Sequence, residues 1–422
     1  MDPSNRLASM VLVTKYDEAA ELLLRAREVY QSKQNEAEYL PLKRDTLTVL
    51  AGEAHNDRRR METALFARAQ LLRFEHSVLQ ESLNRQLARL ARQSVGPGEA
   101  LRADLLRLSR FTLLPVTSAL VGLDVQDNDE WWERLSEFVR LFGIASALQW
   151  KEGDIEQERA ETLQAAVDFD AEIFTPAWDR RVGLIARYDR GELAREDLPQ
   201  DLITALLAHL PGRPRDVILR EVILFFNAST DTSTMAVATA IFHLSEWLQD
   251  HPEDRDLLGD YGFVQRVAFE AIRLHPPPGL IRSAAEDIVL ADGRRIPGGK
   301  EIFIDLKAVN ADVDVFGPDA AQFNPHRDLP AGVKPYAHGF GGGAHKCIGR
   351  PLAMSHDTHD SATSEDGAIG AVVRFIRRLL ELGVQLDPAN PPTVRTGNRQ
   401  ERFATFPILL TEPSALAQLQ DA

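Results

Sequence analysis

The sequence has almost no cysteine: Cys347 is the only one among 422 residues. A single cysteine excludes an internal disulfide and any CxxC zinc framework, and it is typical of a protein kept in a reducing cytoplasm. Basic residues are in the minority as well, because 48 Lys and Arg stand against 63 Asp and Glu and give a formal net charge of -15. Since an acidic surface repels phosphate, we expect no nucleic-acid partner.

Long hydrophobic runs are also missing. The amino-terminal segment MDPSNRLASMVLVTKYDE contains only a short apolar run, so it resembles neither a signal peptide nor a membrane anchor. The longest apolar stretches, such as FTLLPVTSALVGL at residues 111–123, are too short to cross a bilayer. We therefore expect a cytoplasmic protein without a membrane segment.

The sequence is rich in helical periodicity. From residue 16 to about residue 247, apolar residues recur every three or four positions, which predicts helices. Gly and Pro then punctuate short β-prone pieces, of which DIVL and EIFID predict a small hairpin sheet. A helix returns at AIGAVVRFIRRLLELGV, and a last hairpin is expected to turn at Gly397 and Asn398. Without repeats or linkers, residues 1–422 predict one mainly α domain with minor β.

The cysteine lies in the glycine-rich stretch YAHGFGGGAHKCIGRPLA, residues 336–353. A phosphate-binding loop is excluded, because it needs Gly before its Lys and Ser or Thr after it, whereas His345 and Cys347 flank Lys346. A buried structural cysteine in a turn is an open alternative. A zinc site is another, although only HxxH is a recognisable ligand pair. Its candidate ligands are His338, His345, Cys347, His356 and His359.

A third interpretation makes Cys347 a thiolate ligand of haem iron. Glycines allow a chain to wrap closely around a sulfur anion and to direct N–H groups at it, and Gly343 and Gly349 flank the cysteine. The run FGGGAHKCIG resembles the haem-binding loop of the cytochrome P450 family, in which Cys ligates the iron. The resemblance implies haem b (iron protoporphyrin IX) as cofactor, Cys347 as the metal ligand, and Phe340, Gly341 and Gly349 as loop residues around it.

Charged residues elsewhere extend the resemblance. EAIR places Glu270 and Arg273 one helical turn apart, where they can pair, and FNPHR supplies Arg327. In the family this triad is structural and lies behind the haem. Taken alone, the first two residues would be an ordinary surface pair.

Two haem propionates require cationic or hydrogen-bonding partners, and the resemblance supplies them from three segments. AHNDRRR contains His55 and Arg59 one turn apart, and Arg282 and His345 stand at matching positions downstream. The neighbouring Arg58 and Arg60 are expected to form a solvated face.

The stretch FNASTDTST, residues 226–234, resembles the oxygen-activating segment of the family's long central helix. Ala228 and Ser229 would be the small residues at the oxygen site, and Asp231 and Thr232 the acid and alcohol that deliver protons. Most family members have Gly where Ser229 stands. Burying Ser, Thr and Asp in a helix is costly without a task, and a kink solvated by water is the structural alternative.

The resemblance as a whole implies the cytochrome P450 fold, with haem between the long central helix and the cysteine loop. It implies a bacterial-type monooxygenase of secondary metabolism that hydroxylates or epoxidises a small, largely apolar molecule with O2. Two electrons would come from a ferredoxin and its ferredoxin reductase, because the chain has no flavin, nicotinamide or iron–sulfur signature. Alternatives are a peroxygenase, a desaturase, a phenol-coupling oxidase or a non-catalytic haem-binding protein. Candidate substrate contacts are Val49, Ala228, Thr232, Leu280 and Thr405, under a lid of helices between residues 131 and 178.

Two departures from the family pattern lead to further expectations. Ten residues precede VLVTKYDE, fewer than in most bacterial-type members, so we expect one sheet edge and part of the substrate entrance to differ. A polar insert at about residues 355–368 interrupts the helix after the cysteine loop and is expected to loop out. Its acidic residues would weaken ferredoxin docking on basic side chains. Those side chains are Arg58, Arg60, Lys346 and Arg350.

Overall fold

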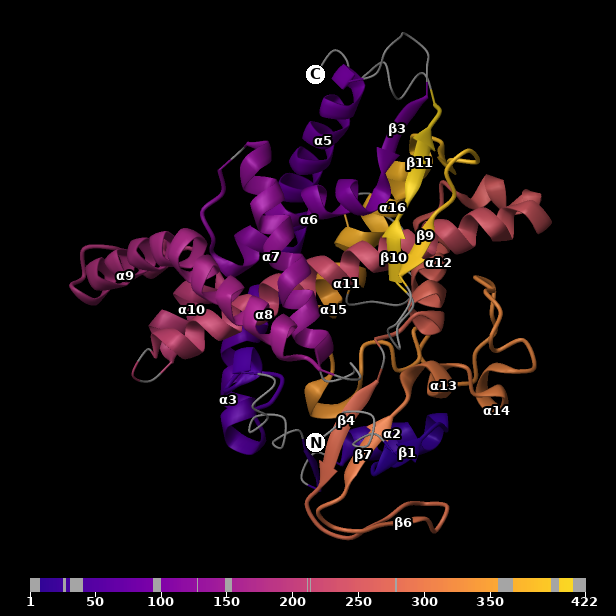
Figure 1. The fold of residues 1–422 in the computed structure, drawn as a ribbon, viewed down its shortest axis with the longest axis horizontal. Coiled ribbons are helices and arrows are strands. Elements are labelled where there is room, and N and C mark those ends of the chain that lie inside the picture. Colours follow the sequence, from indigo (N-terminus) through magenta and orange to yellow (C-terminus); the bar gives the residue numbers. More distant parts are fainter. Residues whose placement is uncertain are drawn as a thin grey trace.

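The computed structural model describes most of the chain in a mainly helical fold. The described residues are 8–25, 28–30, 41–93, 100–126, 128–148, 154–210, 212, 214–277, 279–355, 367–395 and 402–412. Most of the helices lie in the upper and central parts of the molecule in Figure 1, and the largest sheet lies below them. Among the described residues, no helix is both long and apolar enough to cross a membrane.

The helices follow the periodicity of the sequence, and side-chain caps mark several of their starts. Asp104, Asn128 and Asp260, for example, each accept a backbone N–H from the first turn of the helix that follows. The longer helices are α2 (Tyr16–Leu24), α3 (Gly52–Thr63), α5 (Gln80–Gln93), α6 (Leu105–Val121), α7 (Asp129–Ala147), α8 (Glu156–Phe169), α9 (Thr175–Asp189), α10 (Leu202–His209), α11 (Arg215–Asp250), α12 (Tyr261–Leu274) and α16 (Ala371–Glu381). The shorter ones are α4 (Arg68–Arg73), α13 (Leu306–Asn310), α14 (Val313–Phe316), α15 (Arg350–Met354), the 3-10 helices η2 (Pro41–Lys43), η3 (Ala64–Phe66), η7 (Arg195–Asp197), η8 (Pro252–Leu257) and η9 (Gly343–His345), and the π-helical turns η4 (Phe74–Leu79) and η6 (Asp170–Phe174).

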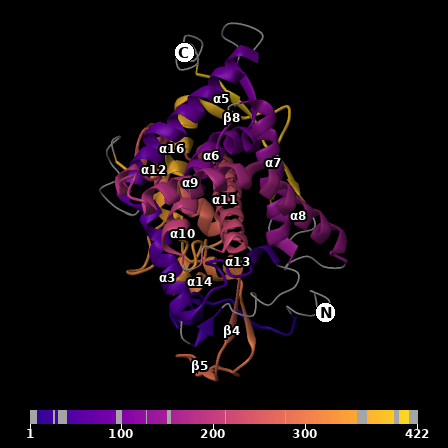
Figure 2. The same ribbon diagram turned by 90° about the vertical axis from the view of Figure 1, so that its left-hand side faces the viewer.

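Helix α11 is the axis of the fold. Its 36 residues run through the middle of the molecule, with α7 and α8 on one side and α12 and α16 on the other (Figure 2). The amino-terminal half packs into a core with α6, α7 and α10, and the carboxyl-terminal half into a second core with α5, α12 and α16. One helix therefore joins both cores, and its middle lies where they meet.

The strands form four small sheets. The largest has the order β1-β7-β4-β2, in which β1 runs parallel to β7 and the other neighbours are antiparallel. The others are β3-β11-β8, β10-β9 and β5-β6. The strands are β1 (Val11–Val13), β2 (Val29–Tyr30), β3 (Leu101–Asp104), β4 (Leu280–Ala284), β5 (Ile288–Val289), β6 (Arg295–Ile296), β7 (Glu301–Ile304), β8 (Val384–Leu386), β9 (Thr393–Arg395), β10 (Arg402–Thr405) and β11 (Pro407–Leu410).

The predicted hairpin between DIVL and EIFID is wrong in its partners. Strand β5 in DIVL pairs with β6, whereas β7 in EIFID lies between β1 and β4. The carboxyl-terminal hairpin is confirmed, because β9 and β10 are antiparallel, and its expected turn lies outside the described residues. The interruption after the cysteine loop is also present, since α15 ends at Met354 and α16 begins at Ala371. Residues 356–366 of the predicted insert lie outside the described part.

Candidate haem-binding site

The cysteine loop holds the sulfur of Cys347 among backbone N–H groups. The Cys347 N–H donates to the Phe340 carbonyl at 2.8 Å, which closes the loop, and the N–H groups of Gly349 and Arg350 point at the sulfur. The side chain itself is exposed. The protein around it nevertheless raises the pKa of the thiol by desolvation, against the opposing effect of these N–H groups and of Arg59 and Arg350. A thiolate here would therefore need a cation bound directly to it.

The glycines of the loop serve different purposes. Gly341 and Gly343 have φ angles of 67° and 59°, and a Cβ on Gly343 would lie 1.8 Å from the Leu23 carbonyl oxygen of α2. Glycine is required there by both backbone angle and space. Gly349 has an ordinary φ of -82°, and a Cβ would sit 3.9 Å from the Cys347 sulfur. The close wrap expected from Gly349 is therefore made by Gly341 and Gly343 instead.

Four basic side chains converge beside this loop. The His55 and His345 rings lie with centroids 4.1 Å apart, and Arg59 donates to the Lys346 carbonyl at 2.8 Å. Burial, together with the charges of His55, Arg282 and Arg59, lowers the pKa of His345 to about 3. Burial also lowers the pKa of Arg282 to about 10. The four residues predicted to bind propionates are thus brought together from α3, β4 and the loop.

The cluster of His55, Arg59, Arg282 and His345, called the basic cluster below, contains no anion. Among the described residues, no salt bridge joins any of the four to a carboxylate, and His55 Nε2 is buried without a hydrogen-bond partner. The only hydrogen bond of the Arg282 guanidinium within that part goes to the Ile281 carbonyl. Arg282 is a buried guanidinium without a carboxylate partner in that part of the chain, and a buried cation requires a negative ligand. The cluster therefore fits the two propionates of haem.

The middle of α11 carries an accessible stripe beside buried residues. Ala228 and Thr232 are exposed and Ala236 is partly exposed, whereas the neighbouring Thr230, Asp231 and Thr234 are buried. Residues four apart lie on one face of a helix. This face of small side chains is open to a ligand over two turns.

The predicted acid and alcohol point in different directions. The Asp231 carboxylate accepts a hydrogen bond from Arg402 Nη1 on β10, and the charge of Asp231 also acts on Arg110 of α6. The Thr232 hydroxyl donates to the Ala228 carbonyl of its own helix at 2.6 Å. Asp231 is thus held by cations on the buried side, and only Thr232 lies on the open stripe.

Ser229, which replaces the usual glycine, is turned toward α6. Its hydroxyl lies 2.9 Å from that of Thr117, which also lies 3.0 Å from the Thr230 hydroxyl. The serine therefore ties α11 to α6 and does not stand on the open stripe. The 36-residue helix is continuous through this polar segment.

The predicted structural triad is present as a buried network. Arg273 donates to both oxygens of Glu270 at 2.7 Å, and Arg327 Nε donates to Glu270 Oε1 at 3.1 Å. Arg273 is fully buried and also bonds the carbonyls of Asn310 and Ala320 at 2.7 Å. These contacts anchor the segment that leads into the cysteine loop, so the alternative of an ordinary surface pair is wrong.

The expectation for Arg58 is also wrong. Arg58 is buried and forms a salt bridge with Glu221 of α11, so it is neither a solvated residue nor a docking residue. Arg60 is exposed as expected, with 78% of its side chain accessible, and pairs with Asp57 at 3.0 Å. Lys346 is exposed and Arg350 is partly buried over the Tyr336 ring.

The remaining candidates are dispersed. Leu280 lies against Gly341 of the loop, Val49 is buried, and Thr405 is exposed on β10 beside Thr393. Among the substrate candidates, only Ala228 and Thr232 lie together, on the open stripe of α11. For zinc, the described residues contain no group of three or more possible metal ligands. His338 packs against Tyr16 at 4.4 Å, and His356 and His359 lie outside the described residues.

The sequence interpretation missed three polar residues near the site. Glu221 pairs with Arg58, Arg402 with Asp231, and Lys43 lines a cavity beside α11. The separations are 163 residues for the first pair and 171 for the second. No local motif connects residues so far apart, and only the tertiary fold could identify them.

Comparisons with known proteins identify relatives of the chain. A sequence model described as Cytochrome P450 matches residues 7–357. Cytochrome P450 734A6 of Oryza sativa subsp. japonica is 33% identical over 168 residues, which are 34% of this chain and 31% of that protein. Pentalenene oxygenase of Streptomyces avermitilis is 31% identical over 206 residues, which are 43% of this chain and 44% of that protein. The matches thus span less than half of these relatives.

Solved structures resemble the chain over nearly its whole length. HmtT, involved in himastatin biosynthesis, has a TM-score of 0.70 at 19% identity, covering 94% of this chain and 91% of that one. P450BioI in complex with a ligated acyl carrier protein has a TM-score of 0.69 at 17% identity, covering 94% and 92%. At such identities the likeness establishes the fold.

Proposed function

Since the chain belongs to the cytochrome P450 family, we propose that it is a haem-thiolate monooxygenase that hydroxylates or epoxidises an organic molecule. Haem, when bound, supplies the iron centre at which dioxygen is activated. The sulfur of Cys347 would hold the iron, and the N–H groups of Gly349 and Arg350 would stabilise the negative charge on that sulfur.

The observation that carries the proposal is the pairing of an exposed cysteine with the basic cluster. Arg59 acts electrostatically on both Cys347 and His345, so the anion-binding groups lie beside the proposed metal ligand. A zinc site or a structural cysteine would need no such excess of cations. Haem would fit both features, because its two propionates are negative and its iron binds a thiolate.

The open stripe of α11 would face the substrate and dioxygen. Thr232 stands there and can present its hydroxyl oxygen to a bound molecule while its proton is donated to Ala228. Asp231 would supply protons from the buried side once Arg402 releases its carboxylate. The side chain of Arg402 is therefore a positioning group for proton delivery.

Electrons would come from a ferredoxin and its reductase. An acidic ferredoxin requires exposed positive charge near the loop, and Lys346 and Arg60 offer it. The substrate would be largely apolar, in keeping with the name of the relative pentalenene oxygenase.

The first test is the absorbance spectrum of the dithionite-reduced protein with carbon monoxide. Thiolate-ligated haem gives a strongly red-shifted Soret band, and we expect this band in the wild type and its loss in Cys347→Ser and Cys347→His. Haem content is measured in parallel, so that a variant that binds no haem is distinguished from one with a changed ligand. A wild type without bound haem would contradict the proposal.

Turnover separates the proposed activity from its alternatives. With O2, NADPH and a surrogate ferredoxin system, we expect product containing one atom of labelled oxygen from 18O2. Product formed only with peroxide would indicate a peroxygenase, and unlabelled product a desaturase or coupling oxidase. Haem binding without turnover of a substrate that shifts the spectrum would indicate a non-catalytic protein.

A further inference from the structure

Two buried carboxylates adjoin the basic cluster along α3. Glu62 stands in the last turn of α3 and Glu221 in the amino-terminal half of α11, and both side chains are fully buried. The charge of Glu221 acts on Glu62, so the two groups are neighbours. Two carboxylates that share a buried site cannot both be ionised at low cost. We therefore expect the pair to retain a proton.

The two carboxylates differ in their partners. Glu221 forms a salt bridge with Arg58, and its two oxygens accept the backbone N–H of Leu47 at 3.0 and 3.1 Å. Both oxygens of Glu62, by contrast, are buried without a hydrogen-bond partner among the described residues. A buried carboxyl group without such partners is more stable as the neutral acid. The proton of the pair therefore belongs to Glu62.

Glu62 is also a neighbour of the basic cluster. It follows Arg59 by three positions on α3, and residues at this spacing lie close together on a helix. Each of these two charges acts on the other. Burial raises the pKa of Glu62 well above its ordinary value, the charge of Glu221 raises it further, and Arg58 and Arg59 oppose the rise. Ionised Glu62 would therefore lower the positive potential that the cluster presents to an anion.

The charged groups that act on Glu62 come from two helices. They are Arg58 and Arg59 of α3 and Glu221 of α11. Arg220 of α11 acts in turn on Glu221. Helix α10 and η3 also pack against α3, and the ionisable residue that they contribute, His209, is exposed.

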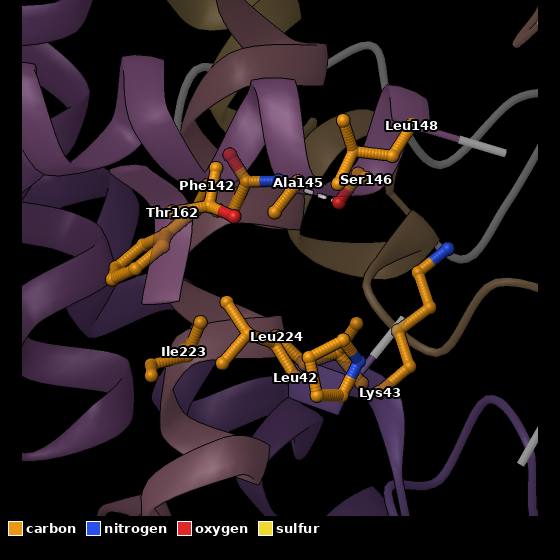
Figure 3. A pocket seen from close by; sticks show the side chains of 11 residues that line it. Leu42, Lys43, Phe142, Ala145, Ser146, Leu148, Thr162, Ile223 and Leu224 are labelled. Carbon is orange, nitrogen blue, oxygen red and sulfur yellow. Dashed lines mark hydrogen bonds between the residues drawn. The ribbon is translucent and has the colours of Figure 1, made fainter. Parts of the chain in front are cut away.

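Lys43 of η2 is separate from this group, although η2 packs against the same helix α11. Desolvation lowers the pKa of Lys43 to about 8, without a contribution from either carboxylate. Figure 3 shows its side chain along the cavity between η2, α7, α8 and α11, with its nitrogen on the side of Leu148. Among the described residues, the charge around Glu62 is thus set by α3 and α11.

We propose that Glu62 is a positioning residue whose protonation controls how tightly the chain holds haem: the neutral acid leaves the positive charge of the cluster to the propionates, and the carboxylate opposes it. The inference rests on the proposed function, since it requires haem at the cluster. By linkage, bound haem must favour the protonated form of Glu62. Haem is therefore held less tightly as the pH rises through the pKa of Glu62. This direction is opposite to that of the thiol, whose binding to a metal is favoured at high pH.

The test compares haem release from the holoprotein at pH 6 and pH 9, measured by transfer to apomyoglobin. Glu62→Gln keeps the shape of the acid and cannot ionise. We expect it to release haem roughly five- to tenfold more slowly than the wild type at pH 9, as for a charge about 10–15 Å from the propionates, and at the wild-type rate at pH 6. Glu62→Asp, which keeps the charge, should retain a dependence on pH.

The matched control is Glu53→Gln, because it removes the same charge from an exposed position of α3, where solvent screens it. Its release rate should equal that of the wild type at both pH values. A second arm repeats the comparison with haem dimethyl ester, whose propionates carry no charge. The difference between the wild type and Glu62→Gln should then disappear.

A purely structural glutamate would give a different result, because Glu62→Gln would then release haem faster at both pH values and with either form of haem. That result, or equal rates for Glu62→Gln and the wild type at pH 9, overturns the inference. The reduced carbon monoxide spectrum separates this failure from that of the proposed function. A wild type with the thiolate band but without the difference at pH 9 rejects only the role of Glu62, whereas a wild type without haem rejects both.

Discussion

Two stripes of the same short helix, α3, have opposite electrostatic character. His55 and Arg59 lie beside the cysteine loop, where no salt bridge among the described residues joins the four basic groups to a carboxylate. Arg58 and Glu62, three positions after His55 and Arg59 respectively, are buried on the adjoining side of the helix, where Glu221 of α11 makes carboxylates outnumber cations. The side with His55 and Arg59 is therefore stabilised by a negative ligand, and the side with Arg58 and Glu62 by protonation of a carboxylate.

The carboxylate side is the more unusual of the two. Both Glu62 oxygens are buried without a partner among the described residues. Burial raises the pKa of Glu62 well above its ordinary value, with a further contribution from Glu221, and raises that of Glu221 to about 7. Two buried carboxylates beside Arg58 cannot both be ionised at low cost. Two neighbouring faces of α3 are thus stabilised in different ways. An anionic ligand stabilises the face that carries the basic cluster, and protonation of Glu62 or Glu221 stabilises the other.

The largest effect is expected from an anion placed in the basic cluster. Arg282→Glu replaces a buried cation with a charge that repels propionates, and breaking such a pair costs about 3–5 kcal/mol, or more than a hundredfold in affinity. Haem release is measured by transfer to apomyoglobin. Arg295→Glu is the control, since Arg295 is exposed and pairs with Asp287. Equal release rates for Arg282→Glu and wild type would show that the cluster does not hold haem.

The next effect tests the opposite stripe. Arg58→Met removes the cation paired with Glu221 and is expected to lower the free energy of unfolding by about 3–5 kcal/mol. The loss should be larger at pH 8 than at pH 6, because Glu221 is protonated more readily at the lower pH. Urea unfolding at both values gives the comparison, with Arg60→Met as the exposed control on the same helix. A loss that is equal at both pH values would contradict the pairing.

The pH dependence of the wild type follows from the same carboxylates. The ordinary pKa of Glu is 4.5, and that of Glu221 in the fold is about 7, so the folded protein binds more protons than the unfolded chain between these values. The free energy of unfolding therefore falls as the pH rises through this window, by on the order of 3 kcal/mol for Glu221, and Glu62 adds to the fall in the same direction. Glu62→Gln and Glu221→Gln should each reduce this slope, whereas exposed Glu253→Gln should not. An unchanged slope in both buried variants would refute the assignment.

The same helix shows how far the sequence alone could be interpreted. The His-x-x-x-Arg spacing placed His55 and Arg59 correctly, because residues four apart share a helical face whatever packs against it. The burial of Arg58 could not be foreseen, since it depends on where α11 lies. The short strand β7 was assigned to the wrong partner for the same reason, because period and turns define a strand but not its neighbours.

The glycine loop could be interpreted further than most segments. Its chain reversals need positive φ angles at Gly341 and Gly343, and a local pattern is enough to indicate them. The partner of Asp231 and the surroundings of Lys43 could not be predicted from such a pattern. Arg402 approaches from the last strands, and the cavity around Lys43 is assembled from four separate elements.

The smallest effect on stability is expected at Arg60, which completes the comparison on α3. Its guanidinium is 78% accessible and pairs only with exposed Asp57 in the described part, so Arg60→Glu should change the free energy of unfolding by no more than about 0.5 kcal/mol. The proposed docking role nevertheless predicts slower reduction by an acidic ferredoxin, because reversing a rim charge lowers the association rate. Stopped-flow reduction should show a several-fold deficit at low salt that disappears at high ionic strength, where the charges are screened. Arg295→Glu, on the β5-β6 hairpin, should be reduced at the wild-type rate. If Arg60→Glu lost as much stability as Arg58→Met, the distinction between the exposed and the buried arginine would be wrong. If its rate of reduction at low salt were unchanged, the ferredoxin would bind at another surface.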